Sequence, residues 1–476
     1  MRLPDHENRI YEKLFTRLSD PARTFVHGGR NIGEISALAA GIRETLVRRD
    51  TSVAQPVCLW LEDRSALLAA LLASLSGGPR FILPHAFNRQ VLEEVREVIP
   101  FERILTDAAL EIPAGMQAIR VEDCRPSRQV LKPVRSPDET FLFLFTGGST
   151  GKPRSWSKTP RNLFGEAFYL AETLGIGADD LFLSTVPPQH IYGLLYSVLL
   201  PFVASARVLR RTCTFPREIL GTLQEEKATV LVSVPIHYGA LRTDDLQRFS
   251  LRLALSSAAP LDPGDASFFL KKTGLAINEI YGSTETGGMA ARAYGANHGS
   301  WEPFVCLDWR ILSERLCVRS NFVSPDLPLD AEGFYLTADR VAKAGENRFR
   351  FLGRTDHIVK IAGKRVDLEE IREKIRRISG VTDACVTALP LNRAGRVQIA
   401  ALVATDLAAG EIRAAIRSMD EPYGLPRRIR VVKAIPVLPN GKIDRQRVDQ
   451  LLAASHLPRT EGKITGDPSL FDVPAL

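Results

Sequence analysis

One stretch of the chain combines small residues with several hydrogen-bond donors, as an anion site requires. Residues 141–156 read FLFLFTGGSTGKPRSW, so apolar residues lead directly into glycines, hydroxyls and a lysine. Glycine lets the backbone approach a ligand closely, and amide and hydroxyl groups bind phosphate. A Walker A loop is excluded, because three residues separate Gly147 from Gly151 and Pro153 follows Lys152. We predict phosphate binding through the hydroxyls of Thr146, Ser149 and Thr150, with a surface linker as the alternative.

A second segment joins an aromatic ring, a hydroxyl and a carboxylate at the end of an apolar run. Residues 280–288 read IYGSTETGG. Tyr281 offers a flat face to a nucleobase and Thr284 a hydroxyl to a phosphate. Glu285 offers a carboxylate to Mg²⁺, which takes oxygen ligands beside substrate phosphates. A polar turn without a ligand is the alternative.

Two charged motifs lie nearer the carboxyl terminus. Arg354 and Asp356 belong to FLGRTDHIVKIAG, where they form either a surface ion pair or a hinge whose arginine reaches a ligand. Lys442 follows Asn440 and Gly441, a dipeptide typical of tight turns. A lysine on such a turn is usually solvated, and a mobile cation delivered into a cleft is the second interpretation.

Strands and helices that alternate along the chain must position these residues. Runs such as PVCLWLE and PRFILP are typical of strands, and RSALLAALLASLSGG between them is typical of a helix. This alternation predicts a parallel sheet flanked by helices, whose ligands bind at the carboxyl ends of the strands. Four later strands end in small or polar residues, and they are predicted in LFLSTVP, ATVLVSVP, RLALSSAAPL and INEIYGSTE.

The chain changes character after about residue 350, where an amphipathic helix is predicted in DLEEIREKIRRISGV. We therefore predict an α/β protein with a large N-terminal domain, residues 1–354, of mixed or parallel sheets flanked by helices. A small α+β domain is predicted for residues 355–455. A flexible tail is predicted for residues 456–476 from their composition.

Composition narrows the class of protein. The chain has 476 residues, 45% hydrophobic and 25% charged, which is typical of a globular protein with more than one domain. It begins without a signal-peptide core, and the apolar stretch from Ile191 is interrupted by Pro201, so we predict a cytoplasmic protein without a transmembrane segment. The six cysteines and eight histidines form no metal-binding motif. The net charge of +7 suits phosphate-rich partners, but no aromatic-interleaved basic motif favours nucleic acid.

Together the motifs resemble the adenylate-forming superfamily of acyl-CoA synthetases, luciferases and stand-alone adenylation domains. The resemblance covers nearly the whole chain and follows the family's order in FTGGSTGKPR, PPQHIYG, SSAAPL, IYGSTETGG, YLTADR, GRTDHIVKIAGKRVDLEEI and LPNGKIDR. It implies an enzyme that joins a carboxylic acid to ATP, releases pyrophosphate and then transfers the acyl group to a pantetheine thiol. It also implies that the small α+β domain is mobile and rotates between the two reactions.

The resemblance also implies a role for each motif residue, with ATP and Mg²⁺ as cofactors. The β- and γ-phosphates would be bound by Thr146, Ser149, Thr150, Gly151 and Lys152. Thr284 would bind the α-phosphate and Glu285 would bind Mg²⁺. Adenine would be bordered by Tyr281 and Ala258, and the ribose hydroxyls held by Asp339 and Arg354. Lys442 would bridge the α-phosphate and the carboxylate of the acid. Asp356 would be the hinge, and Lys360 and Gly363 would lie on the loop that the thiol passes.

The acid is the least defined ligand. The resemblance places His190, a catalytic candidate, and Tyr192 near the acyl pocket, with His237 and Met289 as wall residues. A histidine satisfied within the core is the alternative for His237. Two histidines and a tyrosine suit a hydroxybenzoate-like acid, and a medium-chain fatty acid is nearly as well supported. Residues 294–330 are contracted relative to the family, which leaves the floor of the pocket open.

The thiol acceptor is either CoA or an acyl carrier protein. A carrier is slightly favoured, because carriers are acidic and a basic face is predicted from Arg372, Lys374, Arg376, Arg377, Arg427, Arg428 and Arg430. A solvated helix face is the alternative. Two other functions stay open, a stand-alone amino-acid adenylating enzyme and a non-catalytic nucleotide- or carrier-binding relative. A non-catalytic relative is expected to lose Glu285 or Lys442, and both are present.

Overall fold

The computed structural model describes residues 9–48, 55–109, 112–146, 153–294, 299–355, 358–361, 364–390, 397–417, 425–438 and 441–453. Contacts divide the chain into a large unit, Met1–His357 with Val437–Lys442, and a small unit, Ile358–Pro436 with Ile443–Leu476. The predicted domain boundaries stay predictions, and the predicted tail lies outside the described residues.

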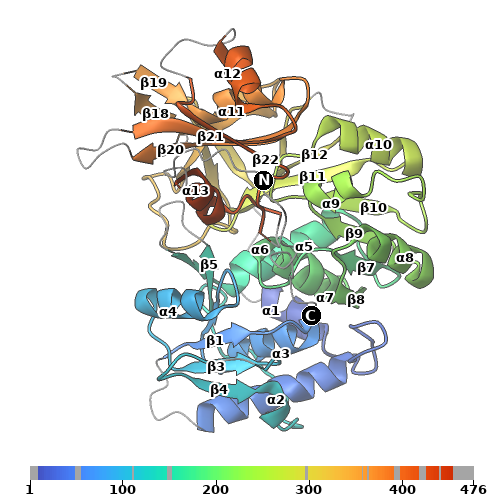
Figure 1. Cartoon of the computed structure of the whole chain (residues 1–476). Coiled ribbons are helices and arrows are strands. Elements are labelled where there is room, and N and C mark those ends of the chain that lie inside the picture. The colour runs from blue at the N-terminus through green and yellow to red at the C-terminus, as the bar shows by residue number, and fades with distance from the viewer. Residues whose placement is uncertain are drawn as a thin grey trace, which may run out of the picture. The chain divides into compact units, whose positions relative to one another are not determined.

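The first sheet of the large unit has six strands in the order β4-β3-β1-β2-β5-β6 (Figure 1). They are β1 Val57–Trp60, β2 Phe81–Leu83, β3 Arg103–Thr106, β4 Gln117–Arg120, β5 Leu142–Thr146 and β6 Arg154–Lys158. Neighbours are parallel except for β5 and β6. Alternate residues of β1 face opposite sides of the sheet. Leu59 therefore packs in the same core as α2 (Ile32–Arg48) and α3 (Arg64–Leu75), whereas Cys58 packs with α4 (Arg89–Val98).

The second sheet has seven strands in the order β13-β12-β11-β10-β9-β7-β8. They are β7 Leu181–Ser184, β8 Arg207–Thr212, β9 Val230–Ser233, β10 Leu253–Ser256, β11 Ile277–Ser283, β12 Gly287–Ala293 and β13 Glu302–Pro303. The strands from β11 to β8 are parallel, and β12 and β13 are antiparallel. One face packs against α8 (Pro216–Glu226), α9 (Pro235–Ala240) and α10 (Pro263–Thr273).

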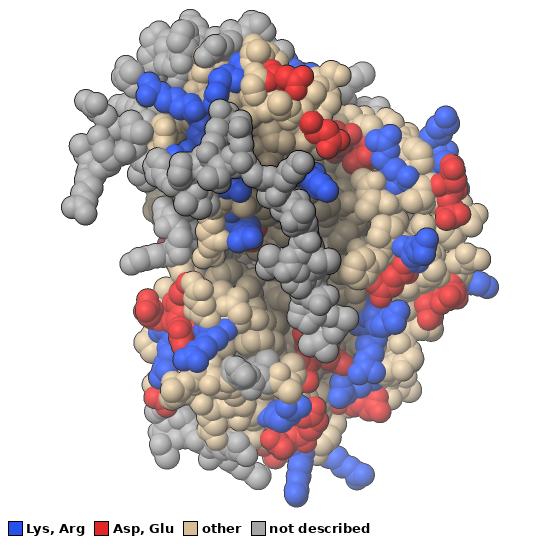
Figure 2. All heavy atoms as spheres, in the orientation of Figure 1, with Lys and Arg blue, Asp and Glu red and all other residues tan. Residues whose placement is uncertain are grey.

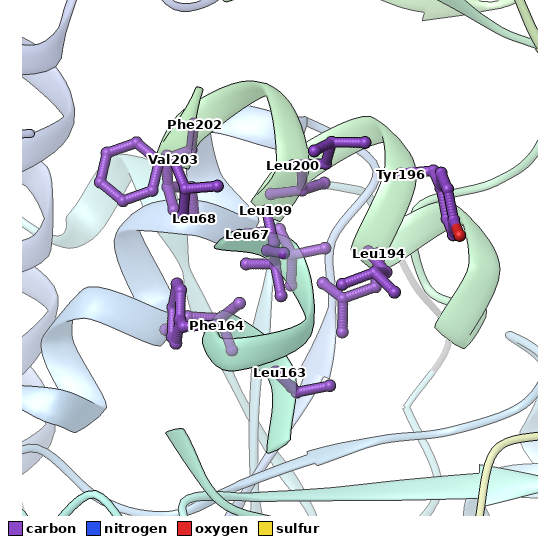
Figure 3. Packing of buried hydrophobic residues seen from close by; sticks show 14 of the residues in the cluster. Leu67, Leu68, Leu163, Phe164, Leu194, Tyr196, Leu199, Leu200, Phe202 and Val203 are labelled. Carbon is purple, nitrogen blue, oxygen red and sulfur yellow. The ribbon is translucent and has the colours of Figure 1, made fainter. Parts of the chain in front are cut away.

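The opposite face of the second sheet shares one hydrophobic core with the first sheet. This core contains α1 (Arg9–Thr16), α5 (Pro160–Thr173), α6 (Ile191–Leu194), a π-helix (Leu195–Leu199) and α7 (Leu200–Val203). Figure 3 shows leucines of α3, α5 and the π-helix packed together, with Tyr196 at the edge of the group. The apolar stretch from Ile191 is therefore buried core, as predicted, and no described helix is long and apolar enough to cross a membrane.

Arg64, on helix α3 of the first sheet, forms hydrogen bonds with residues in and near the second sheet. Its guanidinium is buried and donates to the hydroxyl of Ser197 at 3.1 Å, to the carbonyl of Arg210 at 2.9 Å and to the hydroxyl of Thr212 at 2.9 Å. Burial lowers the pKa of Arg64 to about 10. The donor groups are thus satisfied by residues far along the chain.

A four-stranded antiparallel sheet, β14-β15-β16-β17, completes the large unit. It consists of β14 Asp308–Leu312, β15 Arg315–Arg319, β16 Tyr335–Lys343 and β17 Phe349–Arg354. A short 3₁₀ helix, Val121–Asp123, follows β4.

The small unit combines two sheets with three helices among the described residues. It contains β18 Ile358–Ile361, β19 Lys364–Asp367, α11 Leu368–Arg376, β20 Val381–Pro390, β21 Val397–Thr405, α12 Ala409–Arg417, β22 Arg428–Val432 and α13 Arg445–Ala453. In α11 the predicted apolar face is buried through Leu368, Ile371 and Ile375. The α/β class, with a large N-terminal part and a small sheet domain, is confirmed.

Candidate functional site

The hairpin between β11 and β12 carries Thr284 and Glu285. Beside them, the hydroxyls of Ser283 and Thr286 hydrogen-bond to each other at 2.8 Å. Ser324 donates its backbone N–H to the carbonyl of Glu285 at 2.8 Å. Thr284 is buried and Glu285 is partly buried. Local hydrogen bonds therefore hold both side chains at the carboxyl end of the parallel strand β11.

Asp339 and Arg354 lie opposite each other on the neighbouring strands β16 and β17. Arg354 donates from Nη1 to Oδ1 of Asp339 at 2.9 Å, and the hydroxyl of Tyr281 donates to Oδ2. The Asp339 side chain is 8% exposed and that of Arg354 is 33% exposed, so the carboxylate lies deeper than its partner. Burial raises the pKa of Tyr281, and the charge of Asp339 adds to the effect. The structure thus brings together three residues that the sequence assigned to adenine and ribose.

The ring of Tyr281 lies among aromatic side chains. Its centroid is 5.1 Å from Trp301, 5.8 Å from Phe349 and 5.9 Å from Phe351. Since aromatic pairs at such distances favour fixed orientations, the ring plane of Tyr281 is set by its neighbours.

Ala258, the second predicted adenine neighbour, follows β10 in a left-handed conformation with φ +76°. A non-glycine residue in this region is strained by about 1–3 kcal/mol, and such strain persists where the surroundings enforce it. The hydroxyl of Ser257, next to it, donates to the carbonyl of Ile280 at 2.8 Å. The strained turn is therefore tied to the strand that carries Tyr281.

The predicted phosphate loop follows β5. Thr146 is the last residue of β5, and its hydroxyl oxygen accepts from Nε1 of Trp156 at 3.0 Å. This bond leaves the hydroxyl hydrogen able to donate to a ligand. The other four predicted residues, Ser149, Thr150, Gly151 and Lys152, lie outside the described residues.

His190 precedes α6 and has Lys442 and His85 as electrostatic neighbours. Burial, with added contributions from Lys442 and His85, lowers the pKa of His190 to about 4. His85, which follows β2, was not among the predicted site residues. Its position just after the buried strand FIL could have marked it as a candidate. His190 is therefore a neutral hydrogen-bonding group near neutral pH, and not a cation.

Lys442 belongs to the segment Val437–Lys442 of the large unit. A Cβ atom on Gly441 would lie 3.0 Å from Cγ2 of Val234, so the turn before the lysine packs on the end of β9. The side chain is solvent-accessible, yet surrounding protein atoms lower the pKa of Lys442. Glu285 opposes this shift and Arg354 adds to it. The structure thus brings the predicted lysine into the electrostatic neighbourhood of two other predicted site residues.

The predicted acid-pocket residues differ in their surroundings. Tyr192 and Met289 are buried, and the ring of Tyr192 lies 4.8 Å from that of Tyr196. Nδ1 of His237 hydrogen-bonds to the hydroxyl of Thr185 at 2.7 Å. This bond matches the alternative interpretation of His237 as a satisfied histidine, whereas Tyr192 and Met289 stay candidates for the wall.

Two buried charges behind the 283–288 hairpin were missed by the sequence analysis. Lys158, at the end of β6, is 1% exposed, and Glu166, in α5, is 2% exposed. Oε1 of Glu166 accepts the backbone N–H of Gly288 at 2.8 Å. A signal was present, because Glu166 lies between Leu163 and Leu170 on the buried face of its helix. A charged residue on an apolar helical face indicates a buried polar contact.

The contracted stretch after residue 294 covers the same hairpin. A Cβ atom on Gly288 would lie 2.6 Å from Phe304, and one on Gly287 would lie 2.7 Å from Phe322. Both glycines are therefore required by close packing. Residues 299–330 therefore supply two aromatic side chains against the hairpin.

The predicted hinge and thiol-loop residues belong to a less completely described part of the chain. Asp356 and Gly363 lie outside the described residues. Lys360 lies opposite Arg365 in the backbone register of the antiparallel strands β18 and β19. These roles stay predictions.

The predicted basic face of the small unit is largely engaged in internal contacts. Arg372 donates to Glu369 at 2.6 Å, Lys374 pairs with Glu370 at 2.9 Å and Arg376 pairs with Glu373 at 3.2 Å. The guanidinium groups of Arg428 and Arg430 donate to carbonyls of Leu452 and Leu451. Figure 2 shows Lys and Arg interspersed with Asp and Glu on the visible face of the described chain.

Glu285 fits the donor chemistry that Mg²⁺ prefers, because its partly buried carboxylate lies beside a predicted phosphate-binding hydroxyl. The described residues contain no cluster of three or more His, Cys, Asp or Glu that could hold a metal ion. A magnesium ion here would therefore depend on nucleotide phosphates for most of its ligands.

Comparisons with known proteins show which family and fold the chain shares. The family model described as AMP-binding enzyme matches residues 78–315, which are 238 of 476 residues. The crystal structure of ATP-bound MatB from Rhodopseudomonas palustris has a TM-score of 0.78 and 21% identity, covering 92% of this chain and 98% of that one.

Two curated relatives match over part of their length. Bacitracin synthase 3 of Bacillus licheniformis is 26% identical over 351 residues, 66% of this chain and 6% of that protein. The mitochondrial acyl-coenzyme A synthetase ACSM2 of Rattus norvegicus is 25% identical over 374 residues, 69% of this chain and 64% of that protein. The chain therefore spans less than two thirds of either relative.

Proposed function

The chain belongs to the AMP-binding enzyme family, and from this premise we propose that it activates a carboxylic acid with ATP and passes the acyl group to a pantetheine thiol. One observation carries the proposal. Asp339, on β16, is a buried acceptor held by Arg354 and by Tyr281, and Tyr281 lies on β11, the strand that leads into Thr284 and Glu285. A ribose-binding carboxylate and a phosphate-binding turn are thus joined through one strand.

For nucleotide binding, Asp339 would accept the ribose hydroxyls and the ring of Tyr281 would border adenine. Thr284 and Thr146 would donate to phosphate oxygens, together with Ser149, Thr150 and Lys152. Mg²⁺, held by Glu285 and the nucleotide, would neutralise phosphate charge. Positioning and charge neutralisation are the main means by which proteins promote transfer at phosphorus.

For the chemical step, Lys442 would bridge the carboxylate of the acid and the α-phosphate, two anionic groups that otherwise repel each other. Glu285 lies within its electrostatic range, so the lysine would be oriented before the acid binds. His190, neutral at working pH, would present a hydrogen bond to the acid rather than a charge. Acyl-AMP and pyrophosphate are the products of this step.

We propose CoA as the acceptor, with a carrier protein as the second candidate. The name of the rat relative supports CoA, and the internal pairing of Arg372, Lys374 and Arg376 reduces the charge available to an acidic carrier. A cytoplasmic location is consistent with the six cysteines, all of them described, forming no disulfide.

Amino-acid activation is a second candidate function, favoured by the match to bacitracin synthase 3. An amino acid would need a carboxylate for its α-amine. Glu166 is a buried carboxylate near the hairpin, but it already accepts a hydrogen bond from the N–H of Gly288. We therefore place this function behind acid activation.

The test is release of AMP and pyrophosphate by the purified chain with MgATP and a panel of acids. The panel contains hydroxybenzoates, medium-chain fatty acids and amino acids, each with CoA and then with a phosphopantetheinylated carrier. Release of AMP with one class of acid supports the proposal and identifies the substrate class. The absence of AMP with every acid would refute it.

A further inference from the structure

The side chain of Asn162, in the first turn of α5, is buried and hydrogen-bonded at both ends of its amide. Its Oδ1 accepts the backbone N–H of Thr159 at 2.9 Å. Its Nδ2 donates to the backbone carbonyl of Asn321 at 2.7 Å and to that of Val323 at 3.1 Å. A backbone N–H can only donate and a carbonyl can only accept, so these partners fix the orientation of the amide. Asn162 therefore joins α5 to a segment about 160 residues further along the chain.

That segment, residues 321–326, packs on the hairpin between β11 and β12. Ser324 donates its backbone N–H to the carbonyl of Glu285 at 2.8 Å. A Cβ atom on Gly287 would lie 2.7 Å from Cβ of Phe322, which is the residue between the two carbonyls that accept from α5. The hairpin is therefore supported by a segment whose own backbone is held from α5.

The part of the chain that follows the predicted phosphate loop makes two further contacts of this kind. Ser157, in β6, donates its backbone N–H to Oδ2 of Asp326 at 2.9 Å. Glu166, one turn after Asn162 in α5, accepts the backbone N–H of Gly288 on Oε1 at 2.8 Å. Thus β6 and α5 hold the hairpin both directly and through the supporting segment.

We propose that Asn162 is a positioning residue for nucleotide binding. Its amide holds the segment 321–326 against the hairpin, and this contact sets where Thr284 and Glu285 meet the phosphates and Mg²⁺. The inference rests on the proposed function, which assigns those ligands to the hairpin. The competing interpretation is that Asn162 only caps α5, because it forms a reciprocal capping box with Thr159. A test must therefore separate the loss of the cap from the loss of the two carbonyl contacts.

The test measures MgATP affinity by isothermal titration calorimetry without any acid, with Thr159→Val as the matched control. Thr159→Val removes the hydroxyl that accepts the backbone N–H of Asn162 and keeps both carbonyl contacts. Asn162→Ala removes the carbonyl contacts as well as half of the capping box. We expect the Kd for MgATP to rise at least about fivefold in Asn162→Ala and to stay within about twofold of the wild type in Thr159→Val. Both variants should lower the melting temperature, because each loses a helix cap.

Hydrogen exchange of the nucleotide-free protein, measured by mass spectrometry, reports on the hairpin itself. Peptides that cover residues 281–290 and 320–327 contain the hydrogen-bonded amides of Gly288 and Ser324. We expect both peptides to exchange faster in Asn162→Ala than in Thr159→Val, since local opening governs exchange of such amides.

A rise in Kd below about fivefold in Asn162→Ala, or an equal rise in Thr159→Val, would overturn the inference. Asn162→Asp serves under the same limits if Asn162→Ala does not fold, because a carboxyl group still accepts from Thr159 and offers at most one donor to the two carbonyls. A wild type that binds MgATP but makes no AMP refutes the proposed function and leaves both measurements interpretable. A wild type that binds no MgATP also refutes it, and the exchange measurement then decides alone: equal exchange in the two variants would overturn the role of Asn162.

Discussion

The ion pair between Asp339 and Arg354 and the ion pairs along α11 join the same kinds of side chain but differ in burial and in the sequence separation of the partners. Asp339 is 8% exposed and receives hydrogen bonds from two different elements. In α11 the partners lie one turn apart, and in the pair of Lys374 with Glu370 the side chains are 26% and 66% exposed. The first arrangement fixes an acceptor in a buried place, whereas the second stabilises a helix. The sequence separation of the two partners, more than the number of charges, distinguishes the buried ion pair of the candidate site from the exposed ion pairs of a helix surface.

The largest effect should come from substitution of Lys442, which belongs to the segment Val437–Lys442 of the large unit. Lys442→Ala removes the cation proposed to bridge two anions, so acid-dependent exchange of pyrophosphate into ATP should fall by about 10²–10³ or more. Thioester formation from supplied acyl-AMP should persist, because that step no longer needs the bridge. Exchange at near the wild-type rate would remove Lys442 from the mechanism.

Substitutions at Asp339 and its partner Tyr281 should show the next largest effect. Asp339→Asn removes a charged acceptor, and hydrogen bonds to charged groups contribute about 1.5–3 kcal/mol each, so the KM for ATP should rise about tenfold to a hundredfold. Tyr281→Phe keeps the carboxylate and the ring and should change the KM much less. Steady-state kinetics at saturating acid measure both variants, and equal effects would contradict the ribose assignment.

The free energy of unfolding should depend on pH through His190. The folded pKa is about 4, below the ordinary value of 6.5, so the unfolded chain binds the proton first as pH falls. The stability contribution is complete above pH 6.5 and is lost as pH falls toward 4, by up to about 3 kcal/mol. Urea unfolding at several pH values should show a smaller acid loss for His190→Gln than for the wild type. Identical pH profiles would show that the ring is solvated.

The smallest effect should come from α11. Lys374→Met removes one exposed pair and should lower the free energy of unfolding by less than about 0.5 kcal/mol. The pyrophosphate exchange rate should not change. Thioester formation with a carrier protein serves as the sensitive readout, and a large loss with the carrier but not with CoA would restore the docking face that the pairing argues against.

Much of the fold could be predicted from sequence, because period-two and helical patterns directly report which residues are buried. The alternation of Cys58 and Leu59 between two cores and the buried face of α11 are examples. Motif residues at strand ends, such as Tyr281 and Glu285, could be predicted for the same reason. The surroundings of Glu166 and Lys158 could not be placed, since Gly288, Glu285 and Asp326 lie more than a hundred residues further along the chain. The strain at Ala258 is likewise a property of the folded backbone.

The contacts of Arg64 have a consequence for cutting the large unit into pieces. A fragment that ended before the second sheet would retain this arginine on α3 but lose Ser197, Arg210 and Thr212, its hydrogen-bond acceptors. A guanidinium would then lie against an apolar helix layer without acceptors, which is among the most destabilising changes in a protein interior. The two sheets should therefore melt in a single transition, and split versions of the chain should regain structure only when both halves are mixed.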